Sequence, residues 1–280
     1  MMSMHALNRL IDIALEEDIG TGDITTETLI PADAEGEAVI IAKEPLVLAG
    51  MPVAQAVFRR LDPGLTFSEE LSDGTSVTPG TCILKIPGRL QPLLTGERTA
   101  LNFLQRLSGI ATHVRRYVEA MPTTSIRLVD TRKTTPGWRA LEKYAVRIGG
   151  AANHRMSLSD GILIKDNHVA ICGGIRAALE KARHAAPHTL KLEIEVSTPA
   201  EAREAAEAGA DIIMLDNMGP ETIRKAVRLI DGRALVEVSG GVNRDNLAAL
   251  SASGVDIVSV GALTHSAVAV DISMQVKITS

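Results

Sequence analysis

The feature that most constrains the fold is a regular alternation of apolar runs and helical segments after residue 125. The last four apolar runs have midpoints near residues 192, 213, 236 and 257, a spacing of 21 to 23 residues. The segments between them begin with Thr or Asn and end at Gly209 and Gly254, as capped helices do. This spacing predicts repeated strand–helix–strand units and therefore a parallel sheet. The strands are expected at 126–130, 161–165, 190–196, 211–216, 234–238 and 255–260.

A sheet of this kind is either a closed or nearly closed barrel or an open doubly wound sheet. No GxGxxG motif follows a predicted strand, which disfavours a dinucleotide-binding fold. Before residue 100, turns rich in Gly and Pro separate short apolar runs at 38–42, 46–50 and 82–86, and residues 51–61 have helical spacing. A long helical pattern begins at Gly96. The sequence predicts an α/β protein in which a small α+β domain precedes the parallel sheet.

Composition excludes several classes of protein. A net charge of −5 argues against a general nucleic-acid binder, and aromatic residues, at 2%, are too few for base-stacking platforms. The longest uncharged stretch in the first quarter, 45–58, is shorter than the roughly 20 residues of a membrane span. The first residues predict an amphipathic helix without the features of a signal peptide. Cys82 and Cys172 lie far apart among apolar neighbours, so we expect a reduced, cytoplasmic protein.

Polar and small residues follow all six predicted strands. In parallel α/β folds ligands bind at the carboxyl ends of the strands, so this distribution predicts a ligand site. A solvated rim is the alternative. The residues concerned are Asp130, Thr131, Arg132 and Lys133, then Lys165 to His168, Glu195, Asp216 and Asn217, Ser239 to Gly241, and Gly261 and Ala262.

Two acids in this set, Glu195 and Asp216, end neighbouring strands in apolar surroundings. They can hold Mg²⁺ through water, bind sugar hydroxyls or stabilise a developing positive charge. A structural pair bonded to backbone amides is the alternative. The loops at 239–241 and 261–262 can direct backbone N–H groups at a phosphate, although turns after strands also select glycine.

Five basic residues are expected opposite these acids. Arginine binds carboxylates through two parallel hydrogen bonds and lysine supplies a mobile point charge, so together they predict a small polyanion as ligand. Any one of them can instead form a structural salt bridge. The five are Arg132, Lys133, His154, Arg155 and Lys165. Acids, bases and phosphate loops together suggest transfer between a carboxylate-bearing molecule and a phosphorylated sugar.

The segment 127–168 carries eight basic and four acidic side chains, so it is a basic island in an acidic protein. This distribution favours a compact anionic ligand. For Arg139, Lys143 and Arg147 we prefer a simpler interpretation, in which they form the solvated face of a helix.

Long ordered motifs resemble the quinolinate phosphoribosyltransferase family, and the similarity covers nearly the whole chain. They are EEDIGTGDITTETLIP at 16–31, GERTALNFLQRLSGIAT at 96–112, the stretch from DTRKTTPGW to LIKDNH at 130–168, EIEVS at 193–197, DIIMLDN at 211–217, EVSGGV at 237–242 and GVDIVSVGALTHSAVAVDIS at 254–273.

The resemblance implies an N-terminal α/β sandwich-like domain at 1–110 and an α/β barrel of fewer than eight strands at 111–280, with the last residues returning to the N-terminal domain. It implies that quinolinate and 5-phosphoribosyl 1-pyrophosphate (PRPP) react in the presence of Mg²⁺ to give nicotinate mononucleotide, pyrophosphate and CO₂ in NAD biosynthesis. It also implies a head-to-tail homodimer, with further assembly to a hexamer left open.

The resemblance assigns roles to individual residues. Arg98 is expected to reach quinolinate across the dimer, and Glu195 and Asp216 to face the ribose and the metal through water and PRPP. From the chemistry of the reaction, Lys133 and Lys165 are the expected companions of the departing carboxylate, and which of the two assists its loss stays open. The carboxylate clamp consists of Arg132, His154, Arg155 and Lys165, with Thr131 and Lys133 in the same pocket. The phosphate cradle consists of Ser239, Gly240, Gly241, Val260, Gly261 and Ala262.

One departure from the family pattern is Ser157, where a glycine is usual; we expect its side chain to tighten the loop that carries Arg155. Three other functions are compatible with the pattern. They are a paralogous phosphoribosyltransferase-like protein associated with molybdenum transport, a non-catalytic phosphate-binding regulator, and an aldolase-type barrel that uses Lys165 as a Schiff-base amine.

Overall fold

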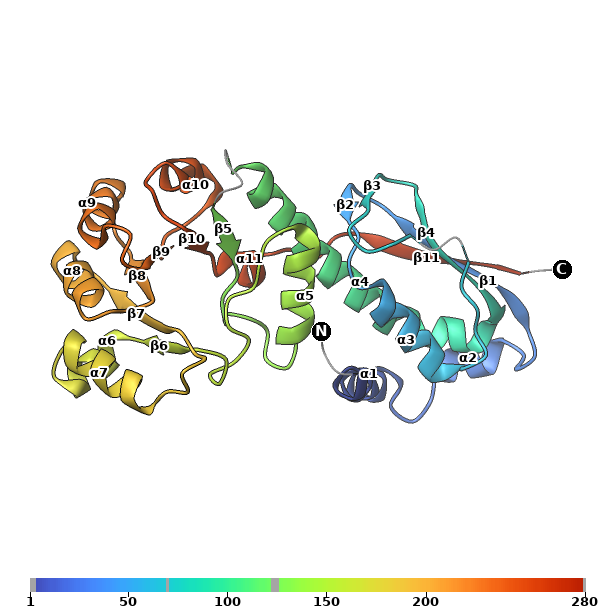
Figure 1. Ribbon diagram of the computed structural model, residues 1–280. Helices are drawn as coiled ribbons and strands as arrows, with labels where there is room; N and C mark the ends of the chain where they lie inside the picture. Colours follow the sequence, from blue (N-terminus) through green and yellow to red (C-terminus); the bar gives the residue numbers. More distant parts are fainter. Residues whose placement is uncertain (1–3, 69–70, 122–125, 279–280) are drawn as a thin grey trace. The chain divides into compact units, whose positions relative to one another are not determined.

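The computed structural model describes residues 4–68, 71–121 and 126–278, apart from the side chain of Ser251 (Figure 1). The chain forms two compact units that interleave along the sequence. The first contains the described residues of 1–115, 135–150 and 267–280, and the second those of 116–134 and 151–266. The boundary expected between residues 110 and 111 lies inside helix α4 (Leu90–Glu119).

The first unit combines helices with a three-stranded antiparallel sheet in the order β11-β1-β4 and a two-stranded sheet β2-β3. Its strands are β1 (Glu35–Ala42), β2 (Leu46–Val47), β3 (Ser76–Val77), β4 (Cys82–Arg89) and β11 (Ile272–Ile278). Its other helices are α1 (Met4–Ile19), α2 (Ile24–Leu29), α3 (Met51–Leu61) and α5 (Arg139–Gly149). The helix expected at 51–61 has the predicted bounds. Strand β11 itself was not predicted, although the resemblance had implied that the last residues return to this domain.

Helix α3 shows how the local sequence sets these elements. Pro52 stands in its first turn, where the missing N–H costs no hydrogen bond. Gly50 precedes it with φ of 103°, and an added Cβ there would lie 2.8 Å from Leu107 Cδ1. Phe58 and Val57 are fully buried on its inner face. Apolar spacing and a glycine at the helix start therefore fix this helix against α4.

Helix α5 corrects the prediction of a solvated charged face. Lys143 and Glu142 are fully buried, and Arg106 Nη2 lies 2.8 Å from Glu142 Oε1. Trp138, which precedes the helix, stacks on Phe103 with ring centroids 4.7 Å apart. Arg147 is exposed as predicted and Arg139 is half-buried, so the correction concerns Lys143. Lys143 and its neighbour Glu142 belong to the interior of the first unit, where Arg106, a partner distant in sequence, compensates the buried glutamate.

The second unit is built on a six-stranded parallel sheet in the order β5-β10-β9-β8-β7-β6. Its strands are β5 (Arg127–Val129), β6 (Ile162–Ile164), β7 (Leu192–Val196), β8 (Ile212–Asp216), β9 (Leu235–Ser239) and β10 (Ile257–Ser259). Each strand from β6 to β10 pairs with its neighbour in sequence, and β5 pairs with β10. A doubly wound sheet reverses its order at a switch point, whereas this order is that of a barrel.

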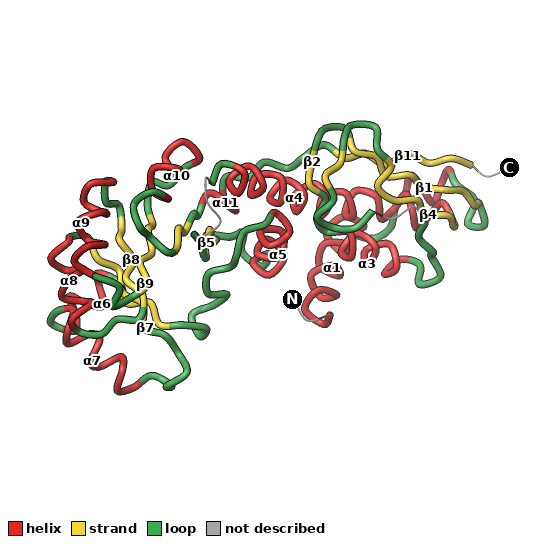
Figure 2. The backbone as a smooth tube through the Cα atoms, turned by 45° about the horizontal axis from the view of Figure 1, so that its top comes forward, coloured by secondary structure: helices red, strands yellow, loops and turns green. Residues whose placement is uncertain are grey.

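Helices follow the strands and lie outside the sheet (Figures 1 and 2). They are α6 (Asp166–Cys172), α7 (Ile175–Ala185), α8 (Pro199–Glu207), α9 (Pro220–Ile230), α10 (Arg244–Ser251) and α11 (Ala262–His265). Thr198 and Asn243 cap α8 and α10 by accepting hydrogen bonds from backbone N–H groups. The predicted fold class, an N-terminal α+β domain with a barrel of fewer than eight strands, is confirmed.

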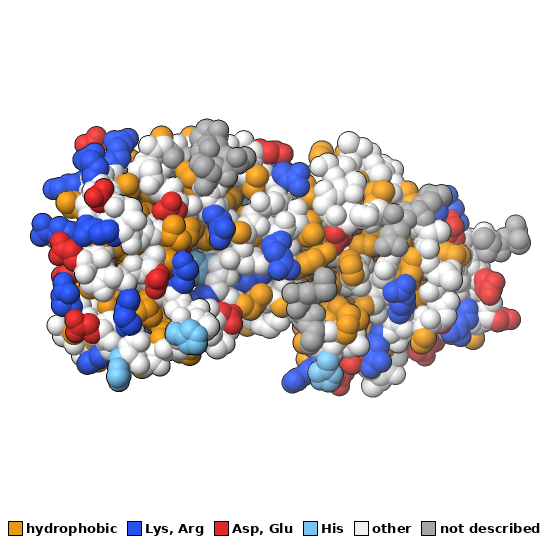
Figure 3. Space-filling model, viewed as in Figure 1, with side chains coloured by type: hydrophobic (Ala, Val, Ile, Leu, Met, Phe, Trp, Pro, Cys, Tyr) orange, Lys and Arg blue, Asp and Glu red, His pale blue; other side chains and the backbone are white. Residues whose placement is uncertain are grey.

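Among the described residues, no helix combines the length and the apolar character needed to cross a bilayer. On the face shown in Figure 3, Lys and Arg side chains of the barrel unit are interspersed with Asp and Glu. The described part of that face therefore carries no continuous basic stripe.

Candidate active site

A cavity of about 730 Å³ lies at the carboxyl ends of the barrel strands. Every strand contributes to its wall, either from its own last residues or from the loop that follows it, because all parallel strands end at the same edge of the sheet. The predicted site residues around it are Thr131, Arg132, Lys133, His154, Arg155, Lys165, Glu195, Asp216, Ser239, Gly240, Gly241, Val260, Gly261 and Ala262. The wall also includes residues that sequence reasoning did not single out, namely Leu163, Met214, Val242, Ser259 and His265.

Two arginines form the cationic wall. In the part of the chain that the structure describes, the buried Nε of Arg132 has no hydrogen-bond partner, and Arg155 donates from Nη1 to the carbonyl oxygen of Gly161 at 3.0 Å. Burial lowers the pKa of Arg155, and the positive charge of Arg132 lowers it further. Two guanidinium groups that repel each other beside a cavity, one with an unused N–H, favour an anion between them.

From the sequence, Lys165 and Glu195 were expected on opposite sides of the site. In the structure they are not. Lys165 Nζ lies 2.7 Å from Glu195 Oε2, with the lysine side chain 48% exposed and the glutamate side chain 17% exposed. The spacing of residues predicted which strand carries each group. It did not predict that the lysine side chain extends from β6 to the neighbouring strand β7. A Schiff-base lysine must be desolvated, so this exposed, paired amine argues against the alternative function of an aldolase-type barrel.

Asp216 is positioned by the loop after β8. Its Oδ2 accepts a hydrogen bond from Asn217 Nδ2 at 2.7 Å, and Asn217 has a left-handed backbone with φ of 53°. Gly240 leaves room for that side chain, because an added Cβ would collide with Asn217 Oδ1. The glycine-rich loop after β9 thus serves the neighbouring carboxylate as well as lining the cavity.

The loop after β10 approaches the cationic wall equally closely. A Cβ on Gly261 would lie 2.8 Å from Lys133 Cδ. Thr264 Oγ1 donates to the carbonyl oxygen of Lys133 at 2.7 Å. Gly261 therefore lets the loop pack against Lys133, which fixes this lysine at the cavity wall.

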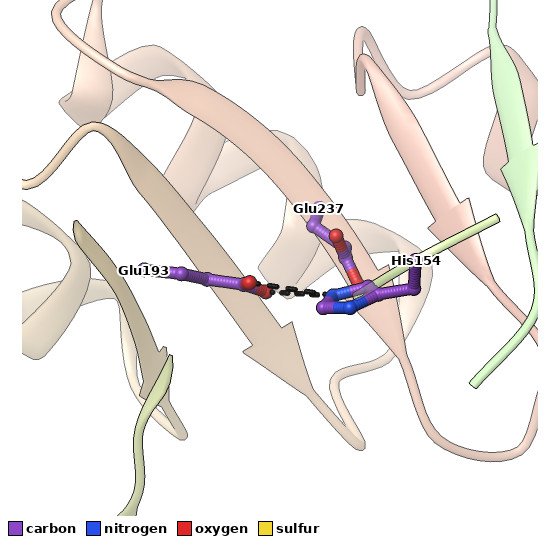
Figure 4. A group of neighbouring side chains, drawn as sticks. All are labelled: His154, Glu193 and Glu237. Carbon is purple, nitrogen blue, oxygen red and sulfur yellow. Dashed lines mark hydrogen bonds and ion pairs between the residues drawn. The ribbon is translucent and has the colours of Figure 1, made fainter. Parts of the chain in front are cut away.

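Below the cavity, two glutamates face His154 (Figure 4). Glu193 on β7 and Glu237 on β9 are 6% and 1% exposed. His154 Nε2 lies 3.3 Å from Glu193 Oε2 and 3.6 Å from Glu237 Oε1. Burial, and secondarily the charge of Glu193, raise the pKa of Glu237 to about 7. Sequence reasoning missed both glutamates, although an acid two positions before Glu195 in an otherwise apolar strand signals an inward polar group.

The loop that carries Arg155 is closed by its own hydroxyl groups. Ser157 Oγ and Ser159 Oγ lie 2.7 Å apart, and the backbone N–H of Ser157 donates to Asp160 Oδ2 at 2.7 Å. The side chain that replaces the usual glycine therefore forms a contact within this loop.

Arg98 lies elsewhere. It belongs to α4 in the first unit and lines a smaller cavity of about 360 Å³, together with Asp18, Asp23 and Thr95. It is not among the residues that line the barrel cavity.

Comparisons with known proteins agree over the whole chain. The family models of the quinolinate phosphoribosyl transferase N-terminal and C-terminal domains match residues 23–108 and 110–275. A probable nicotinate-nucleotide pyrophosphorylase [carboxylating] of Bacillus subtilis is 44% identical, covering 100% of this chain and 96% of the relative. The human nicotinate-nucleotide pyrophosphorylase [carboxylating] is 39% identical, covering 96% and 91%.

Solved structures give the same result. The crystal structure of NadC from Streptococcus pyogenes superposes with a TM-score of 0.96 at 43% identity, over 100% of this chain and 99% of that one. The nicotinate-nucleotide pyrophosphorylase of Francisella tularensis gives a TM-score of 0.94 at 40% identity, over 99% and 98%. By sequence along its whole length and by fold, this chain belongs to the quinolinate phosphoribosyltransferase family.

Proposed function

We propose that this protein transfers the phosphoribosyl group of PRPP to quinolinate and releases CO₂, giving nicotinate mononucleotide and pyrophosphate for NAD biosynthesis. The observation that carries the proposal is the composition of one cavity wall. Cationic side chains, two carboxylates and glycine-rich loops line the same cavity of about 730 Å³. Each group matches one part of the two substrates.

The cations bind the acceptor. Quinolinate carries two carboxylates on adjacent ring carbons, and Arg132, Arg155 and Lys133 can neutralise them while fixing the ring. Quinolinate must approach PRPP, which is also an anion, so neutralisation removes a repulsion as well as orienting the ring nitrogen. Thr131 lines the same wall, and its Oγ1 accepts a hydrogen bond from the backbone N–H of Lys133 at 3.1 Å. In this proposal Lys133 and Lys165 accompany the departing carboxylate.

The carboxylates serve the ribose. Breaking the bond to pyrophosphate leaves positive charge on the sugar, and Glu195 and Asp216 stabilise that charge through their negative field. Glu195 is paired with Lys165 at 2.7 Å. Binding of quinolinate gives Lys165 a competing anionic partner and so frees Glu195 to face the sugar. Ser239, Gly240, Gly241, Val260, Gly261 and Ala262 receive the 5-phosphate through backbone N–H groups and small side chains.

Mg²⁺ fits this arrangement, because carboxylate oxygens are the protein ligands that it prefers. Glu195 and Asp216 would hold it through water and PRPP. When bound, the ion takes up charge from the leaving pyrophosphate. Within the described part of the chain, neither Cys82 nor Cys172 forms a disulfide bond, in keeping with the cytoplasmic location that we propose.

The proposed function is tested by incubating the purified protein with quinolinate, PRPP and Mg²⁺ and separating the products by chromatography with mass detection. We expect nicotinate mononucleotide, with nicotinate as a poor substitute for quinolinate, because only quinolinate engages the whole cationic wall. Equal turnover of nicotinate, or no nucleotide product, would contradict the proposal.

We further propose a homodimer in which Arg98 acts in the partner's site, since it lines a cavity separate from that of the other cations. Arg98→Ala and Glu195→Gln should each be inactive alone. Mixed and reassembled, they should recover about one quarter of wild-type activity, because half of the dimers then contain one site with both residues intact. A mixture as inactive as its components, with mixed dimers demonstrated by tagging, would contradict a shared site.

A further inference from the structure

Two buried acids lie below the site without a role in the mechanism above. Glu193 and Glu237 face the barrel interior from β7 and β9, in a layer where parallel barrels normally place apolar side chains (Figure 4). Glu193 is 6% exposed and Glu237 1% exposed, and Oε1 of Glu237 has no hydrogen-bond partner among the described residues. Burying two carboxylates is costly, so their retention calls for a function.

The hydrogen bonds of His154 identify what the acids contact. The backbone N–H of Arg155 donates to His154 Nδ1 at 2.8 Å, so Nδ1 is the unprotonated nitrogen. The proton therefore resides on Nε2, whose hydrogen-bond partner is Glu193 Oε1 at 3.4 Å. The ring acts as a bridge, accepting from Arg155 on one side and donating to Glu193 on the other.

The same tautomer argues against a cation between these three residues. Their ligand atoms lie within 4.8 Å of one another, which is close enough to surround a metal ion. A histidine that ligates a metal through one nitrogen normally donates a hydrogen bond from the other. Here the other nitrogen accepts, so Nε2 carries a proton and is not available as a ligand.

The segment around His154 is held from a second direction. The backbone N–H of His154 donates to Asp130 Oδ1 at 2.9 Å, and Asn153 Nδ2 donates to Asp130 Oδ2 at 2.7 Å. Asp130 is fully buried at the end of β5. The backbone that carries Arg155 is thus fixed by Asp130 on one side and by the His154 ring on the other. The Arg155 guanidinium extends from this backbone beside the repelling charge of Arg132.

We propose that Glu193 and Glu237 are positioning residues that hold the His154 ring in one orientation, so that its Nδ1 fixes the backbone of Arg155 and directs the guanidinium into the cavity. The inference rests on the proposed function, in which Arg155 binds a carboxylate of quinolinate. Glu193 is the primary hydrogen-bond acceptor, and Glu237 supports the ring from the neighbouring position.

The kinetic test compares two substitutions of Glu193. Glu193→Gln keeps a hydrogen-bond acceptor of the same size, whereas Glu193→Leu removes the acceptor and leaves an apolar side chain. We expect Glu193→Leu to raise the KM for quinolinate by about 10-fold to 100-fold, because a displaced Arg155 guanidinium loses part of its charge-assisted hydrogen bonding to the substrate carboxylate. The KM for PRPP and kcat should change by less than about threefold, and Glu193→Gln should restore quinolinate binding.

A second comparison separates positioning from loss of structure. Glu193→Leu in a His154→Ala background should add no further effect on the KM for quinolinate, since the acid acts through this ring. Additive effects, or equal losses for quinolinate and PRPP, would overturn the proposal.

A spectroscopic readout does not depend on turnover. The ¹⁵N shifts of labelled histidine distinguish the two imidazole tautomers, and His154→Ala identifies the signal of His154. We expect the Nε2-protonated form in the wild type and in Glu193→Gln, and a mixture of forms in Glu193→Leu. An Nδ1-protonated ring in the wild type would overturn the inference, whereas absence of nucleotide product with the expected tautomer would count against the proposed function alone.

Discussion

Asp216→Asn is expected to lower kcat by about 10²-fold to 10³-fold, the loss typical when one preorganised charge-stabilising group is removed from an active site. The substitution keeps an oxygen that can accept the hydrogen bond from Asn217 Nδ2, so the loop after β8 should retain its conformation. What is lost is the negative charge that, in the proposed mechanism, faces the ribose as positive charge develops there. KM values for quinolinate and PRPP should remain within a few-fold of wild type.

The matched control is Asp231→Asn at the end of α9. Asp231 is exposed and has a left-handed backbone with φ of 51°, which asparagine tolerates well. Its kcat should equal that of the wild type. Steady-state kinetics at saturating substrates, with thermal unfolding to verify the fold, gives the comparison. Normal kcat in Asp216→Asn would show that this charge is not used in the transition state.

Arg155→Ala is expected to act on binding of the acceptor. The KM for quinolinate should rise by about 30-fold to 1,000-fold, equivalent to about 2–4 kcal/mol, because truncation leaves a substrate carboxylate without its partner in a desolvated site. Arg155→Lys keeps the charge but loses the paired N–H donors, so its KM for quinolinate should lie between the values of the wild type and of Arg155→Ala.

Arg228→Ala serves as the control for loss of a positive charge. Arg228 is an exposed residue in the last turn of α9, and its removal should leave the KM for quinolinate unchanged. Isothermal titration with quinolinate gives the affinity independently of turnover. An Arg155→Ala variant that binds quinolinate as tightly as the wild type would remove Arg155 from the acceptor site.

The parallel sheet was predictable because its information is local. Each strand is a short apolar run, Thr198 and Asn243 cap the starts of α8 and α10, and a repeat of 21 to 23 residues links the last four strands. Parallel strands then bring their carboxyl ends together without further instruction. For that reason Glu195, Asp216 and Ser239 were identifiable as neighbours from sequence alone.

Features that depend on distant partners were not predictable in the same way. Strand β11 is defined by its antiparallel pairing with β1, more than 200 residues earlier in the chain. Lys143 has the sequence context of a surface helix, yet it is fully buried. Its neighbour Glu142 pairs with Arg106, which lies 36 residues away. Such pairings depend on the packing of the whole unit, and periodicity along one helix does not reveal them.

The site shows the same division. Residue types and strand positions predicted which groups surround the cavity, but not how their side chains pair inside it. Lys165 contacts Glu195 rather than facing it from across the site, and His154 contacts Glu193 below the cavity. These details depend on how far each side chain reaches and on whether it is buried. The face to which a side chain points alternates along a strand and changes with strand register.

A structure of the protein with quinolinate and a non-reactive PRPP analogue would show whether acceptor and sugar meet in the barrel cavity, as we propose. We expect the quinolinate carboxylates on Arg132, Arg155 and Lys133, and the ribose of the analogue beside Glu195 and Asp216. Quinolinate bound outside the cavity, or a ribose facing away from both carboxylates, would contradict the account.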